Sequence, residues 1–124
     1  MKISKALKRK LRNIALKNGQ PYHLVAILRR NKSIIKVGTN TSKTSPEFTR
    51  CYHDGSLGHH MHAEMSVLSR SRPGDWVQVC RFVRSSDDYV MAKPCEYCVR
   101  FMKQKGISIV KYTNEYGNWE DISL

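Results

Sequence analysis

The 124-residue sequence has no long hydrophobic run, and none of its apolar stretches approaches the roughly 20 residues that a membrane-spanning helix requires. The basic segment 1–19 lacks the apolar core and the cleavage site of a secretory signal. Internal repeats, low-complexity tracts and linkers are also missing. We therefore expect a single domain over residues 1–124, located in the cytoplasm and without a membrane partner.

Acidic residues are scarce in the first part of the chain. Residues 1–50 contain 13 basic side chains and only one acid, Glu47, whereas residues 51–124 contain nine of each sign. The net charge of +12 is therefore carried by residues 1–50. Such a positive field favours a partner with phosphates, either nucleic acid or a nucleotide. The alternative is a solvated basic helix that only aids solubility.

Cysteine is also limited, with four residues in the chain. Two disulfides could be formed from them, but no secretory signal is present. In a reducing compartment, spaced cysteines more often bind metal or take part in catalysis.

Helical periodicity begins at the N-terminus, where Ile3, Leu7, Leu11 and Ile14 recur on one face. Gly19 and Pro21 should end this helix. Residues 22–30 and 33–37 are β-prone and predict a hairpin. Residues 38–60 show no clear period, and long loops of this kind are usually functional or mobile.

The second half of the chain alternates helices with strands. A helix is expected from about residue 62 to residue 71, and a strand over residues 76–84. Pro94 is expected to open a third helix, which Gly106 closes. Residues 107–112 and 119–124 predict two final strands, and their connection is too short to contain a helix, so they should be antiparallel neighbours. The resulting order, αββαβαββ, predicts an α/β sheet with helices on its faces.

Two short motifs carry the candidate chemistry, His62-Ala63-Glu64 and Pro94-Cys95-Glu96-Tyr97-Cys98. Cys95 and Cys98 are three residues apart, so on a helix they share one face of the first turn. The start of a helix also favours the thiolate, which is the form that binds metal. With His62 they supply three ligands suited to Zn²⁺, leaving a fourth position for water. Glu64 would lie beside the metal and could transfer protons.

Both motifs together closely resemble the zinc-dependent cytidine deaminase superfamily. The resemblance covers nearly the whole chain and implies a cytidine deaminase-like three-layer sandwich with a five-stranded mixed sheet, its last two strands antiparallel. It implies that His62, Cys95 and Cys98 bind a single Zn²⁺ per chain. It also implies that Glu64 is the catalytic proton shuttle in the hydrolytic removal of an exocyclic amine from a base. Members are often dimers or tetramers, so a homo-oligomer is a further implied partner.

The resemblance also suggests where the substrate is held. Asn40 follows the second predicted strand, where related deaminases place an Asn that binds the sugar, although an Asn in this position also suits a turn. Lys43, with the hydroxyls that follow it, could bind a 5′-phosphate or a nucleic-acid backbone. Ala63, between ligand and shuttle, belongs to the substrate pocket. Four other side chains could stack on a base or simply pack, namely Phe48, Tyr52, His53 and Tyr97.

The remaining cysteines and histidines allow two interpretations. Cys80 lies in a predicted strand and is expected to be a buried hydrophobe. A second zinc is sometimes held by the corresponding loop in deoxycytidylate deaminases, but without tight spacing a solvent-facing loop is the simpler interpretation. The loop residues concerned are Cys51, His53, His59 and His60.

The features bearing on the substrate point in different directions. An antiparallel final hairpin resembles free cytidine and blasticidin-type deaminases. The histidine ligand departs from the free cytidine enzymes, which normally have a cysteine at this position. The short basic chain looks like deaminases carried by phages. The leading hypothesis is a zinc-dependent deaminase of a cytosine nucleoside or nucleotide, yielding the uracil form and ammonia. The alternative is a deaminase of single-stranded DNA or RNA that uses basic residues 1–50. An inactive zinc-binding module would have no use for Glu64.

Overall fold

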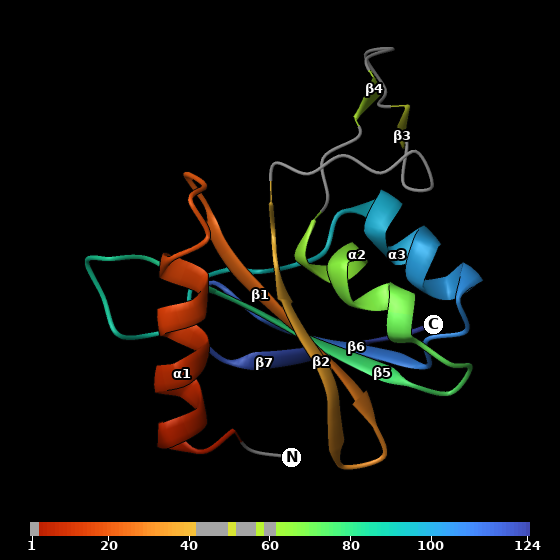
Figure 1. Ribbon diagram of the computed structural model, residues 1–124, viewed down its shortest axis with the longest axis horizontal. Coiled ribbons are helices and arrows are strands. Elements are labelled where there is room, and N and C mark those ends of the chain that lie inside the picture. The colour runs from red at the N-terminus through yellow and green to blue at the C-terminus, as the bar shows by residue number, and fades with distance from the viewer. Residues whose placement is uncertain (1–2, 42–49, 52–56, 59–61) are drawn as a thin grey trace.

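The computed structural model describes residues 3–41, 50–51, 57–58 and 62–124 (Figure 1). Its elements are α1 (Lys5–Leu16), β1 (His23–Arg30), β2 (Ser33–Thr39), β3 (Arg50–Cys51), β4 (Leu57–Gly58), α2 (Ala63–Val67), the 3₁₀ helix η2 (Leu68–Arg70), β5 (Trp76–Phe82), α3 (Glu96–Gln104), β6 (Ile109–Thr113) and β7 (Trp119–Ser123). No helix in these ranges is both long enough and apolar enough to cross a membrane.

Five strands form a mixed sheet, as predicted, and their order is β2-β1-β5-β6-β7. β5 and β6 are parallel, and the other neighbouring pairs are antiparallel. The final pair runs from Ile109 opposite Ser123 to Thr113 opposite Trp119, which confirms the predicted antiparallel hairpin. α3 lies between the two parallel strands in the sequence, because a parallel connection needs a crossover long enough to hold a helix.

Helices cover both faces of this sheet, so the fold has three layers (Figure 1). On one face, Leu11 and Ala15 of α1 pack against Val25 and Ile27 of β1, in a cluster that also contains Cys80. Cys80 is 1% exposed, as expected of a buried hydrophobe. On the other face, α2 and α3 cover a larger cluster. Its members include Ala26, Leu28, Met65, Val67, Val77, Val79, Cys98 and Met102.

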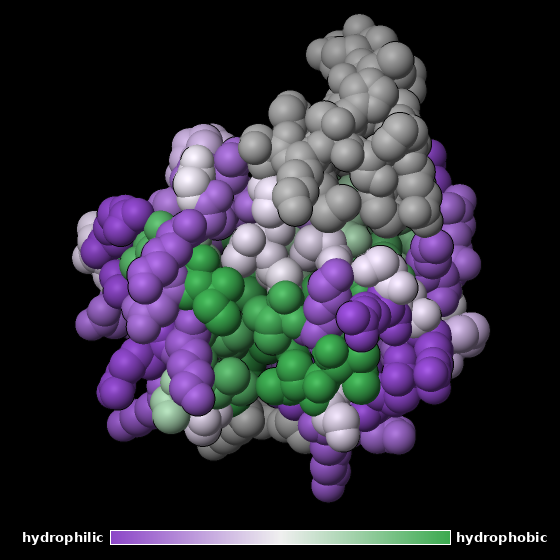
Figure 2. Space-filling model, in the orientation of Figure 1, coloured by the Kyte–Doolittle hydropathy of each residue, from purple (hydrophilic) through white to green (hydrophobic). Residues whose placement is uncertain are grey.

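Alternation along the strands explains why two clusters form. Successive residues of β1 point to opposite faces, so Val25 and Ile27 face α1 while Ala26 and Leu28 face α2 and α3. Figure 2 shows hydrophobic side chains across the middle of one side of the molecule, where the edge strand β2 runs between α1 and α2. Ile34 of this strand is 43% exposed. The β2 edge therefore presents apolar surface to solvent.

Several predicted boundaries differ from the structure. The second helix is an α-helix only to Val67 and then tightens into η2. Pro94 does not open α3, because Cys95 is its N-cap and the helix begins at Glu96. Ile14 is 44% exposed, since α1 turns Leu11, Ala15 and Leu16 toward the sheet instead. Within residues 38–60, β2 continues to Thr39, and β3 pairs with β4.

Gly38 of β2 sets the distance between the sheet and α2. It pairs with Ala26, on the face that α2 covers. A Cβ atom at this position would overlap the hydroxyl of Ser66 and lie 3.0 Å from Ser66 Cβ. The hydroxyl is itself held, because Ser66 Oγ donates to the Ala63 carbonyl at 2.6 Å. The missing side chain therefore lets α2 rest directly on the strand.

We predict that Gly38→Ala lowers the free energy of unfolding by about 1–3 kcal/mol, because the added methyl group overpacks this contact. Urea denaturation measures the change. In a Ser66→Ala background, which removes the overlapping hydroxyl, the same substitution should cost less. Equal costs in the two backgrounds would show that the Gly38–Ser66 contact is not responsible.

Candidate metal centre

Three potential metal ligands come from the starts of two helices. His62 is the N-cap of α2 and Cys95 is the N-cap of α3, each in extended backbone with ψ near 160°. Cys98 lies in the first turn of α3, and its backbone N–H donates to Cys95 Sγ at 3.4 Å. Because α3 connects β5 to the parallel strand β6, its first turn lies near the carboxyl end of β5, where ligands commonly bind in α/β folds.

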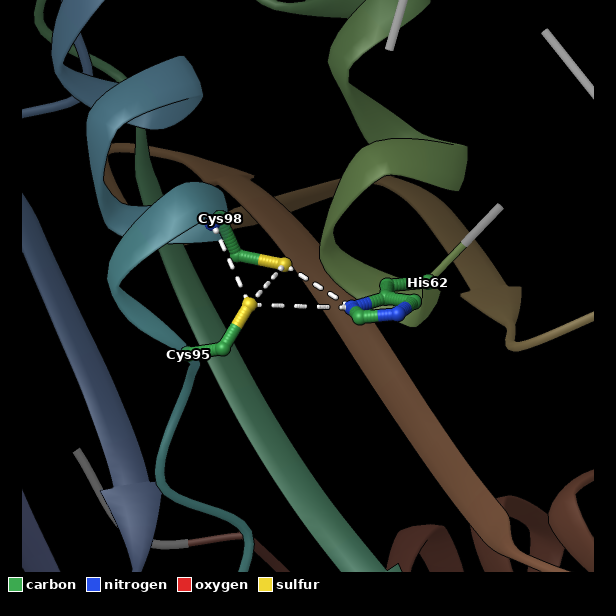
Figure 3. A group of neighbouring side chains, drawn as sticks. All are labelled: His62, Cys95 and Cys98. Carbon is green, nitrogen blue, oxygen red and sulfur yellow. Dashed lines mark hydrogen bonds between the residues drawn. The ribbon is translucent and has the colours of Figure 1, made fainter. Parts of the chain in front are cut away.

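Their donor atoms form a compact triangle (Figure 3). His62 Nδ1 lies 3.1 Å from Cys98 Sγ and 3.9 Å from Cys95 Sγ, and the two sulfur atoms are 3.3 Å apart. In a tetrahedral zinc site the same atoms would be about 3.5–3.8 Å apart, from Zn–S and Zn–N bonds of about 2.3 and 2.0–2.1 Å. The donor set and its spacing therefore fit a metal such as zinc.

The two thiols differ in acidity because they share a hydrogen bond. This contact lowers the pKa of Cys95, and hydrogen bonding to His62 lowers it further. The pKa of Cys98 is raised by the contact with Cys95 and by burial. One sulfur of the pair is thus readily ionised, which suits a ligand that must bind as thiolate.

Glu64 lies beside the triangle and is only 3% exposed. Burial raises the pKa of its carboxyl group, while attraction to His62 and a hydrogen bond with Cys98 partly oppose this. Within the described part of the chain, the Glu64 carboxyl forms no ion pair with a lysine or an arginine that would explain its burial. Its position instead suits proton transfer beside the donor triangle.

These residues open onto a pocket of about 280 Å³. The pocket is lined by Tyr22, Leu24, Asn40, His62, Ala63, Glu64, Lys93 and Cys95. It therefore brings together five of the residues singled out from the sequence, namely Asn40, His62, Ala63, Glu64 and Cys95. Tyr22, Leu24 and Lys93 were not among them, since the first two were assigned only to a strand. The position of Lys93, two residues before Cys95, could have indicated its place in the lining.

Asn40 lies at the pocket, but most of its side-chain amide is already engaged. Oδ1 accepts from the Leu24 backbone N–H at 3.0 Å and from Asn18 Nδ2 at 2.8 Å. Nδ2 donates to the Tyr22 carbonyl at 3.1 Å. Within the described ranges, the second hydrogen of Nδ2 has no acceptor and could donate to a ligand. Asn40 thus orders the chain around the end of β2 and also borders the pocket, and its role in binding a sugar stays a prediction.

Other candidate residues are not placed at this site. Tyr97 is buried in α3 beneath the Arg100 guanidinium, 5.6 Å from the ring centre, and does not line the pocket. Lys43, with the hydroxyl residues after it, lies outside the described residues. The same holds for the loop residues Phe48, Tyr52, His53, His59 and His60, and for the side chain of Cys51. Both interpretations of this loop, the simpler solvent-facing one and the second zinc, therefore concern residues outside the described ones.

Comparison with known proteins identifies the fold. The dCMP deaminase from the cyanophage S-TIM5, solved in complex with dCMP and dUMP, is 24% identical with a TM-score of 0.55, over 90% of this chain and 81% of that one. A cytidine deaminase from Burkholderia pseudomallei is 22% identical with a TM-score of 0.54, over 98% of this chain and 93% of that one. No family model and no curated protein matches the sequence. The chain therefore has a cytidine deaminase-like fold.

Loss of a residue that only contacts a metal ligand typically reduces metal affinity about 10–100-fold. Because Cys98 is assigned as a ligand itself, we predict that Cys98→Ala reduces zinc affinity by more than about a hundredfold. Competition with a chromophoric chelator measures the affinity, and elemental analysis measures zinc per chain. Cys80→Ala is the matched control, since it removes a buried thiol from the cluster under α1. Zinc binding by Cys98→Ala equal to that of the control would disprove the ligand assignment.

Proposed function

We propose that this protein is a zinc-dependent hydrolase that deaminates a cytosine nucleoside or nucleotide to the uracil form and releases ammonia. The observation that carries the proposal is the juxtaposition of a His62, Cys95 and Cys98 donor triangle with the buried Glu64 carboxyl at one pocket. A closed structural zinc site would need a fourth protein ligand, and no other His or Cys in the described residues joins the group.

His62, Cys95 and Cys98 would hold the metal, which supplies a Lewis acid that makes water a stronger nucleophile at neutral pH. Glu64 accepts a proton as the water oxygen bonds to C4 of the base, and donates it to the ring nitrogen. When the bond between C4 and the exocyclic nitrogen breaks, Glu64 transfers the second proton of the former water to the departing amine, which leaves as ammonia. The overall reaction consumes one water and forms the carbonyl of uracil.

The pocket walls suit a nucleoside ligand. Ala63 is small and buried, which leaves room for a planar base beside Glu64. Leu24 adds an apolar wall, and the remaining amide hydrogen of Asn40 can donate to a sugar hydroxyl. Lys43 stays a candidate for phosphate binding on the sequence alone.

The arrangement of charge favours a small substrate over single-stranded DNA or RNA. Exposed basic residues of α1, such as Lys5, Arg9 and Lys10, belong to the helix that packs on the face of the sheet opposite α2 and α3. The pocket includes His62 and Cys95, the residues at the starts of α2 and α3, and none of its described lining residues belongs to α1. The charge of this helix therefore does not line the pocket, and it suits the alternative role of keeping the protein in solution.

We predict that Glu64→Gln keeps zinc and fold but lowers kcat by at least about 10²–10⁴-fold, because it removes the proton-transfer group. Mass-resolved assays with cytidine, deoxycytidine, their monophosphates, adenosine and a single-stranded oligonucleotide measure turnover. Glu96→Gln, an exposed acid in the first turn of α3, is the control and should stay active. Undiminished turnover by Glu64→Gln would refute its role, and conversion of the oligonucleotide alone would favour the polynucleotide alternative.

A further inference from the structure

We propose that Arg81 and Lys93, with Tyr22 beside the Arg81 guanidinium, form a subsite for the 5′-phosphate of a cytosine nucleoside monophosphate. This inference rests on the proposed function and makes it more specific. It concerns residues that the sequence motifs do not include and that lie beside, not within, the donor triangle.

The strand register places Arg81 on the pocket side of the sheet. Arg81 belongs to β5, where Val77 and Val79 face the cluster beneath α2 and α3. Because side chains alternate along a strand, Arg81 points to the same face. Its partner across the ladder is Leu24, which itself lines the pocket. The arginine therefore emerges next to the pocket wall.

The Arg81 side chain has a buried hydrogen-bond donor without an acceptor. Its Nε atom is buried and has no hydrogen-bond partner, the one such side-chain atom found among the described residues. The guanidinium carbon lies 5.2 Å from the centre of the Tyr22 ring, and Tyr22 lines the pocket with 58% of its surface exposed. A buried N–H without a partner is unfavourable, so an acceptor brought by a ligand would satisfy it.

Other arginines in the structure show how unusual this is. Arg30 forms a bidentate pair with Asp75, with both N–O distances 2.9 Å. Arg84 donates to the Leu16 carbonyl at 2.8 Å. Arg12 reaches the carbonyls of the segment after β5, at 3.3–3.4 Å. The guanidinium groups of these arginines form hydrogen bonds that stabilise the fold, whereas Arg81 Nε forms none within the described residues.

Lys93 supplies a second positive charge at the same pocket. It is exposed, it lines the pocket, and it forms no ion pair with any residue that the structure describes. The one carboxyl group in the lining, Glu64, is at the buried end among the metal ligands. The pocket thus combines donor atoms and a buried acid with one exposed ammonium group, and the Arg81 guanidinium lies beside Tyr22 of its lining.

This combination of a buried acid and nearby positive charges matches the base and the phosphate of a nucleoside monophosphate. The base must reach Glu64 for deamination, so the phosphate is left to face the cationic part of the pocket. A phosphate monoester carries about two negative charges near neutral pH and offers several acceptor oxygens. A guanidinium can bind such a group with two parallel hydrogen bonds, and an ammonium adds a point charge. Two cations suit one terminal phosphate better than an extended backbone.

The test compares ligands that differ only by the phosphate, using the zinc-loaded full chain. Calorimetry gives Kd for dUMP and for deoxyuridine, and steady-state kinetics gives kcat/KM for dCMP and for deoxycytidine. The wild-type protein should favour the phosphorylated member of each pair by at least about tenfold, as expected for charge-assisted hydrogen bonds. Arg81→Ala and Lys93→Ala should each reduce this preference at least about threefold.

Arg72→Ala is the matched control, because it removes the same charge from an exposed position before the opposite end of β5. It should keep the wild-type preference. Lys93 is exposed, so its variant remains informative if Arg81→Ala fails to fold. Equal affinity of the wild-type protein for dUMP and deoxyuridine would overturn the subsite, as would a preference that both variants retain. Tighter, Arg81-dependent binding of a single-stranded oligonucleotide would overturn the assignment to a monophosphate.

The two proposals fail in distinguishable ways. If deoxycytidine and dCMP are deaminated equally well by the wild-type protein and both variants, the subsite is wrong and the deaminase function stands. If no cytosine compound is converted but dUMP binds in a manner that depends on Arg81, the anion subsite stands and the proposed reaction is wrong.

Discussion

His62 and Cys95 each occupy the residue just before a helix, and the candidate site exists because those two helix starts meet above the central strands. Neither helix could hold the donor triangle alone, since α2 supplies the imidazole and α3 supplies both sulfur atoms. Their positions are fixed by packing, with Met65 and Val67 of one helix and Met102 of the other buried against β1 and β5. The chemistry of the site thus depends on the hydrophobic layer beneath it.

The groups gathered there differ in acidity. Burial raises the pKa of Glu64, and the contact with Cys95 together with burial raises that of Cys98, while hydrogen bonds with Cys98 and His62 lower the pKa of Cys95. Side chains that are equally close in space therefore differ in their tendency to carry charge. Such differences within one small site allow some groups to bind a cation while another exchanges protons.

Much of this arrangement follows from local patterns in the sequence. Spacing alone places Cys95 and Cys98 on one face, and the short connection before β7 requires the final antiparallel pair, so both could be predicted. Arg81 and Tyr22 could not, because their contact depends on the register between β5 and β1, which no local pattern encodes. The early end of α2 and the close approach at Gly38 likewise depend on how helix and sheet pack.

Asn40 joins parts of the molecule that lie on different faces of the sheet. Its side chain is hydrogen bonded to Asn18, just after α1, and to the backbone of Tyr22 and Leu24 on the pocket wall. Asn18 in turn donates to the Tyr22 carbonyl at 2.9 Å. The wall is consequently held by hydrogen bonds from the segment that directly follows α1, and none of the described residues that line the pocket belongs to α1 itself. Ordering of the pocket and docking of α1 are thus thermodynamically linked, and each stabilises the other.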